Sequence, residues 1–297
     1  MKISLVKFSS IIIAILCYTS CYAQSAFKTL ADFTKEKDEI FLRNVFVDSD
    51  IKKVLKREIK EGLVTPENLT PLKIGLITTY LYEEKYIFPK SHILYLHSNT
   101  DGGSPYFVEK ITLPSIKGLK DALIDNGFQL LEPSEFLSSA EIKDYKDLAE
   151  KTNRVNDLFV RTVKEAKLSP APSGYEFIYS MALDGRSGKV SDNFGEFARK
   201  MGLDAVLSLE IGTVYQKKTI YLSQVIISMH SWVKDNQGKY KSLLMNIYQF
   251  SPDFYYPIIG IVNGKAAHEN LVGFEELANR IGKDYCSYIN ESINSAF

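Results

Sequence analysis

The chain has 297 residues, and its 36 lysine and arginine side chains balance 36 aspartate and glutamate side chains. A formal net charge of zero leaves no basic field that would attract nucleic acid or an anionic membrane, so neither is an expected partner. The length is ample for an ordinary hydrophobic core.

The first 23 residues have the pattern of a secretory signal peptide. Lys2 and Lys7 form a positive segment, the apolar run 11–16 follows it, and small and polar residues lead to Ala23. The apolar run is shorter than the about 20 residues that a membrane-spanning helix needs. The pattern therefore predicts an exported protein that is periplasmic, attached to the envelope or extracellular.

Two kinds of processing fit the end of this leader. Cleavage after Ala23 would leave Gln24 as the new N-terminus. The segment Tyr18–Cys21 instead resembles a bacterial lipobox, in which Cys21 would be lipidated and would tether the protein to a membrane. Because a lipobox usually has an aliphatic residue where Tyr18 stands, the sequence favours simple cleavage.

The body of the protein uses cysteine and histidine sparingly. Cys17 and Cys21 belong to the leader region, so Cys286 remains alone and no disulfide within the body is expected. Cys286 lies in an apolar-periodic segment, which favours a small buried hydrophobe over a nucleophile. None of the four histidines has a second histidine or a cysteine at metal-ligand spacing. We therefore predict neither a metal site nor a cofactor.

Residues 24–70 are predicted to form an N-terminal helical segment that ends in a linker. Ser49 can cap a helix whose apolar side chains share one face, namely Ile51, Val54, Leu55 and Ile59. Pro66 and Pro71 mark the linker.

An α/β domain is predicted over residues 71–297. A strand from Lys73, a helix that opens at Pro114 and a short strand at 128–131 follow one another, which implies a crossover and a parallel pair of strands. The composition of residues 98–105 indicates a flexible loop before the helix.

Residues 136–190 are interpreted as an insertion in this domain, because the alternation of helix and strand resumes after them. The charged residues 138–168 predict one or two helices. The alternation of Tyr175, Phe177 and Tyr179 predicts a strand over 175–183.

The second half of the domain begins with a helix that Ser191 or Asp192 caps and Gly202 ends. A long helix over 274–293, with a wide apolar stripe, is expected to pack on the sheet. Between these helices the predicted strands are 205–215, 220–234 and 243–250. The fold class is therefore α/β, with a mixed sheet of about five strands, helices packed on it and N-terminal helices before it.

One set of polar residues could carry chemistry. The side chains predicted to face away from the core are Ser208, Glu210, Gln224, Ser228, His230, Trp232, Asn246 and Tyr248. If their strands are neighbours, Glu210, His230 and Asn246 share one face, and a glutamate beside a histidine could act as general acid and base. The alternative interpretation is an ordinary solvent-exposed face, because antiparallel sheets often expose one side.

The order of these elements resembles a known group of bacterial envelope domains. The helix that ends in Leu119–Gly127 precedes the strand Phe128–Leu131, and the helix Phe194–Met201 precedes the junction and strand Gly202–Ile211. A long hairpin with Asp235–Gly238 at its turn follows. Over residues 71–290 this is similar to the TolB N-terminal and curli-secretion-lipoprotein (CsgG-like) group. The resemblance implies a domain that scaffolds or binds partners in the envelope, with no catalytic residues to transfer.

The sequence therefore favours a non-enzymatic exported protein whose α/β domain binds another envelope protein or supports an assembly. Membrane contact is expected only through lipidation at Cys21. Two alternatives remain. One is a hydrolase-like enzyme that uses Glu210, His230 and Asn246, and the other is a carrier of a small apolar ligand, which the 18 tyrosines and 17 phenylalanines could surround.

Overall fold

A computed structural model describes residues 30–35, 37–47, 51–62, 73–83, 103–153, 171–179, 187–234, 237–252, 256–262 and 265–295. Several predictions fall outside these residues, namely those for the leader 1–23 with Cys21, for Ser49, for the linker 64–71, for 98–102 and for 154–170. Within the described ranges, no helix is both long enough and apolar enough to cross a membrane.

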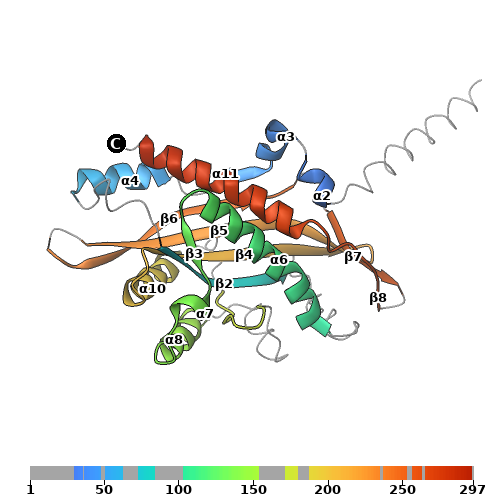
Figure 1. Ribbon diagram of the computed structural model, residues 1–297, viewed down its shortest axis with the longest axis horizontal. Helices are drawn as coiled ribbons and strands as arrows, with labels where there is room; N and C mark the ends of the chain where they lie inside the picture. The colour runs from blue at the N-terminus through green and yellow to red at the C-terminus, as the bar shows by residue number, and fades with distance from the viewer. Residues whose placement is uncertain are drawn as a thin grey trace, which may run out of the picture.

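The centre of the fold is an eight-stranded mixed sheet in the order β1-β6-β5-β4-β2-β3, with β7 paired to β5 and β8 to β7 (Figure 1). The strands are β1 (Val45–Val47), β2 (Lys73–Glu83), β3 (Gln129–Leu131), β4 (Ala205–Gln216), β5 (Thr219–Lys234), β6 (Tyr240–Phe250), β7 (Tyr256–Val262) and β8 (Lys265–Glu269). The α/β class is confirmed. The expected count of about five strands was too low, partly because β1 and β8 are too short to show a clear alternation.

Helices cover both faces of this sheet. They are α2 (Leu30–Phe33), α3 (Asp38–Leu42), α4 (Ile51–Lys60), α6 (Gly103–Asp125), α7 (Pro133–Phe136), α8 (Ile142–Asn153), α10 (Ser187–Lys200) and α11 (Phe274–Asn294). The helices α6 and α11 lie side by side on one face, which we call the first face (Figure 1). The helices α7, α8 and α10 lie on the opposite side, the second face.

The parallel pair predicted around the first helix of the domain is confirmed, because β2 and β3 run parallel and α6 connects them. The helix is longer than predicted: it begins at Gly103, inside the expected loop, and contains Pro114. Proline removes one helix hydrogen bond. The helix continues through it because Val108 and Ile111 before the proline, and Leu119 after it, pack into the same core.

The C-terminal helix α11 packs as its apolar stripe predicts. Its buried apolar residues include Phe274, Leu277, Ala278, Ile281, Tyr285 and Ile289. Cys286 is buried beside them and has no disulfide, and its burial raises the pKa of the thiol to about 12. The interpretation of Cys286 as a small buried hydrophobe is therefore supported, since so high a pKa keeps the thiol protonated.

The second face of the sheet is buried, so the expectation of a solvent-exposed face was wrong. Every residue of β4 from Ala205 to Val214 is buried. The side chains of α8 and α10 that cover Val206 and Ile77 include Tyr145, Leu148, Phe194 and Phe197. Residues read as an insertion thus contribute a covering layer, which the local alternation of the strands does not reveal.

Residues 171–179 cross the second face without regular strand structure, so the predicted strand was wrong over 175–179. Side chains hold this segment in place of a strand partner. Thr78 Oγ1 donates to the Glu176 carbonyl at 3.1 Å, and Asn153 exchanges two hydrogen bonds with the backbone of Phe177 and Tyr179, at 2.6 and 2.8 Å. Alternating aromatic residues therefore pack on the sheet here without joining it.

The N-terminal segment is joined to the body and includes a strand that the sequence did not suggest. Strand β1 pairs antiparallel with β6. The Phe41 ring stacks on Phe250 with centroids 4.9 Å apart, and the Arg280 guanidinium of α11 lies 4.2 Å from the centroid of Phe41.

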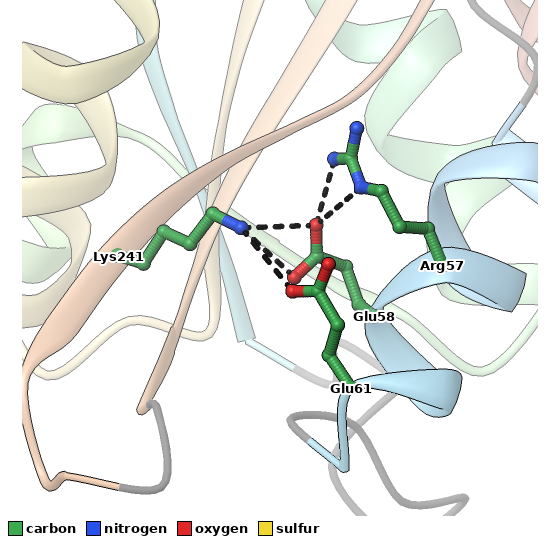
Figure 2. Close-up of polar contacts among 4 residues, drawn as sticks. All are labelled: Arg57, Glu58, Glu61 and Lys241. Atoms are coloured by element: carbon green, nitrogen blue, oxygen red, sulfur yellow. Dashed lines mark hydrogen bonds and ion pairs between the residues drawn. The ribbon is translucent and has the colours of Figure 1, made fainter.

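Helix α4 docks through a fully buried carboxylate, Glu58, whose side chain is 0% exposed (Figure 2). Lys241 of β6 donates to both of its oxygens at 3.2 and 3.1 Å. Arg57 donates to Oε1 at 3.0 and 2.7 Å, and Glu61 lies 4.0 Å from the Lys241 ammonium. A buried carboxylate is costly unless cations and hydrogen bonds compensate it, so this network ties α4 to β6.

Removal of Lys241 tests this buried network. We expect Lys241→Met to lower the free energy of unfolding by about 3 kcal/mol, near the low end for a broken buried pair, because Arg57 stays in place. The double variant Glu58→Met, Lys241→Met buries no charge and should recover most of that loss. Urea unfolding followed by circular dichroism measures both, and a double variant as unstable as the single one would contradict this account.

Candidate functional site

A groove of about 650 Å³ lies where α10 crosses the hairpin of β5 and β6. This volume is within the range of ligand-binding clefts. The lining residues are Asp192, Gly195, Glu196, Arg199, Trp232, Lys239, Tyr240, Lys241 and Ser242. Helix α10 supplies one wall, and the two strands supply the floor and the opposite rim.

Gly195 allows α10 to lie directly on the strands. A Cβ atom at this position would lie 2.4 Å from Ser242 Oγ and 2.8 Å from the Ser231 carbonyl oxygen, closer than van der Waals contact permits. Ser242 Oγ in turn donates a hydrogen bond to the Asp192 carbonyl at 3.1 Å. The wall of the groove is therefore fixed against its floor.

Two aromatic side chains form the floor. Trp232, the only tryptophan in the chain, donates from Nε1 to the Leu203 carbonyl at 2.9 Å, which fixes its ring. Tyr240 meets Trp232 edge to face, with centroids 5.4 Å apart, and is 46% exposed. The floor is thus a rigid aromatic surface that solvent reaches.

Cations gather at the hairpin end of the groove. The Arg199 guanidinium lies 4.3 Å from the centroid of the Tyr240 ring, and the Lys234 ammonium lies 5.9 Å from the same centroid. Lys239 also lines this end. Within the part of the chain that the structure describes, the Arg199 guanidinium has no carboxylate or carbonyl partner. The arrangement can therefore hold an anionic group against an aromatic surface.

The residues predicted to form an acid–base pair share one face but are not neighbours. Glu210 pairs across the strands with Ile226, whereas His230 pairs with Val206. Val206 and Glu210 stand four positions apart on β4, which corresponds to about 13 Å at the rise of a strand. The structure does not bring the two side chains together.

Both residues are also sealed from solvent. His230 is 0% exposed, and its ring meets the Phe194 ring of α10 edge to face at 4.9 Å. Burial lowers the pKa of His230 to about 3, so its imidazole is neutral in the folded protein. Glu210 is equally buried and accepts a hydrogen bond from Ser208 Oγ at 3.4 Å.

The third strand does not contribute as predicted. A bulge between Met229 and His230 shifts the register, so that Asn246 stands opposite Met229 and Tyr248 opposite Ile227. The placement of Tyr248 on the second face was wrong, since its ring packs on Tyr285 of α11, with centroids 5.5 Å apart. Asn246 holds a register position opposite a residue of the first-face core. A shift of one residue reverses the face of every later side chain.

Of the three side chains that stack in the groove, one was predicted from the sequence and two were not. Trp232 was placed on the second face, where it lies. Arg199 and Tyr240 were not singled out, because their contact depends on how α10 crosses the hairpin. Among the described residues, no group of three or more histidine, cysteine, aspartate or glutamate side chains could hold a metal ion.

No family model, curated protein or solved structure matches this chain. The resemblance to the TolB N-terminal and CsgG-like group therefore stays a prediction.

The burial of His230 predicts a loss of stability in acid. The unfolded chain binds a proton at this residue below about pH 6.5, whereas the folded imidazole stays neutral to about pH 3. The free energy of unfolding should therefore fall as the pH drops from 6.5 towards 3, by about 1.4 kcal/mol per pH unit from this residue.

Urea unfolding at a series of pH values tests this, with His230→Leu as the comparison. The carboxylates are common to both proteins, so their contribution cancels in the difference. We expect the variant to lose less stability than the wild type in this window. Parallel pH profiles would show that His230 is not held neutral by the fold.

Proposed function

We propose that this chain is an exported, non-catalytic protein that binds another protein of the bacterial envelope through the groove between α10 and the β5–β6 hairpin. The observation that carries the proposal is the aromatic floor, with partly buried Trp232 and exposed Tyr240, beside the stacked Arg199 guanidinium. Tryptophan, tyrosine and arginine are the residues that most often dominate binding energy at protein interfaces.

The rigidity of the groove supports a binding role. The Trp232 ring is held by the Leu203 carbonyl, and the Tyr240 ring contacts both Trp232 and Arg199. Gly195 allows α10 to lie against the strands. A partner that meets side chains already fixed in place loses less conformational entropy on binding. The groove therefore has the preorganisation of a recognition surface.

The two alternative functions receive less support. Glu210 and His230 are buried and stand about 13 Å apart along the strands, so neither can meet a substrate or the other. The aromatic content that suggested a ligand carrier is largely used in packing. The large, fully buried aromatic side chains include Tyr80, Tyr82, Phe107, Phe194, Tyr248 and Tyr285.

The proposed location in the envelope is based on the signal-peptide pattern of residues 1–23. The charged, apolar and small-residue segments of residues 1–23 support export. The resemblance to the TolB N-terminal and CsgG-like group points to the same compartment and to the same kind of role. Lipidation at Cys21 would hold the protein at a membrane, whereas cleavage after Ala23 would release it.

Site-specific photocrosslinking tests the groove as the binding surface. A photoreactive tyrosine analogue at Tyr240, in the full chain expressed in the organism that encodes it, should form a discrete cross-link to a protein. Tyr215 of β4 is a matched control, since it is 40% exposed and pairs with Ile220, which lies at the other end of β5. Tyr240 stands opposite Lys234, roughly 45 Å along the strand from that position.

The cross-linked protein is then purified and added to the purified chain. Saturable binding that Tyr240→Ala weakens and Tyr215→Ala leaves intact would support the proposal. Equal cross-linking from the two positions, or none from Tyr240, would overturn it.

A further inference from the structure

The groove has charges of opposite sign at its two ends. Asp192 and Arg199 stand seven positions apart on α10, about 10 Å along the helix axis. Lys239 and the nearby Lys234 join Arg199 at the hairpin end. The second lining carboxylate, Glu196, lies 3.5 Å from Lys151 of α8, which offsets its charge from the outer side of the helix. Arg199 is therefore the lining cation in contact with the aromatic floor, and Lys234 lies near it.

Arg199 is the cation best placed to bind a ligand at that end. The guanidinium lies over the Tyr240 ring at 4.3 Å, and such stacking fixes the plane of the guanidinium while its N–H groups remain available at the edge. The described residues offer those N–H groups no acceptor. A planar carboxylate accepts two parallel hydrogen bonds from an arginine in this geometry.

Lys241 lines the groove as well, but its ammonium is already paired with Glu58. Its ammonium donates to both oxygens of Glu58 (Figure 2). Because Glu58 lies on the first face, Lys241 adds little attraction for a ligand on the second face. Arg199 therefore carries the recognition of an anion, with Lys234 as longer-range attraction.

We infer that the groove recognises an acidic segment of the partner polypeptide, in which one carboxylate binds Arg199 and an adjacent aromatic side chain packs on Trp232. The inference rests on the proposed function and names the chemistry of the partner. The carboxylate comes from an aspartate or glutamate side chain, or from the C-terminus of the partner. A carboxylate beside an aromatic group matches both halves of the site, the stacked guanidinium and the indole ring.

The emission of Trp232 tests the inference directly, because no other tryptophan contributes to it. The probe is a hexapeptide with both ends blocked, in which aspartate and phenylalanine alternate. We expect a saturable change in the emission of the mature chain, which weakens as salt is added. The same peptide with asparagine in place of aspartate should bind on the order of tenfold more weakly. An alanine peptide with a free C-terminal carboxylate distinguishes the two sources of the acid.

Variants assign the binding to Arg199. Arg199→Gln should lower the affinity for the acidic peptide on the order of tenfold and leave the affinity for the asparagine peptide unchanged. Arg199→Lys keeps the charge but loses the paired hydrogen bonds, so its affinity should be intermediate. Arg43→Gln, at an exposed arginine after α3, is the matched control and should bind as the wild type does. Circular dichroism establishes that each variant is folded.

Three results would overturn the inference. They are equal affinity for the acidic and asparagine peptides, an Arg199→Gln variant that binds the acidic peptide as the wild type does, and a change in emission with maltohexaose, an uncharged oligosaccharide, but not with the acidic peptide. If Tyr240 cross-links to a protein while acidic peptides fail to bind, the carboxylate inference is wrong and the binding function stands. If the cross-link also fails, both are wrong.

Discussion

Three consecutive residues of strand β6 are bound alternately on the two faces of the sheet, and these contacts position the strand that borders the groove. Successive side chains of a strand point to opposite faces. Tyr240 and Ser242 meet Arg199 and the Asp192 carbonyl of α10 on the second face, whereas Lys241 between them binds the buried Glu58 of α4 on the first face. The ion network of the N-terminal segment therefore fixes the strand that forms the rim of the groove. Arg57 of α4 and Lys241 of β6 offset the cost of burying Glu58, and Lys241 links the carboxylate to this rim.

The burial of the second face decides which polar residues are available for function. Helices α8 and α10, with residues 171–179, convert a row of polar side chains into part of the interior. Glu210 and His230 become structural residues in this setting, and the neutral imidazole packs on Phe194. Accessible polar and aromatic side chains are present at the end of the β5–β6 hairpin, where we place recognition. Helix α10 thus helps to bury the predicted acid–base site and also forms the wall of the groove.

Local patterns in the sequence predict the parts of this fold that local forces determine. The apolar stripe of α11 and the alternation of β4 and β5 are visible in the residues, and both are present in the structure. The start of α6, the bulge that reverses Tyr248 and the cover of the second face depend on packing between distant segments. Of the groove, only Trp232 could be placed on its face, because the stacking of Arg199 on Tyr240 joins two elements that are adjacent only in space.

The central claim is that the buried carboxylate of Glu58 holds β6 and thereby the rim of the groove. Hydrogen exchange followed by mass spectrometry tests it most directly, on the wild type and on Glu58→Gln, with strand β4 as an internal reference. The claim predicts faster exchange in the peptides of β6 around Tyr240–Ser242, while β4 exchanges as in the wild type. Unchanged exchange in β6, or equal acceleration in both strands, would contradict it.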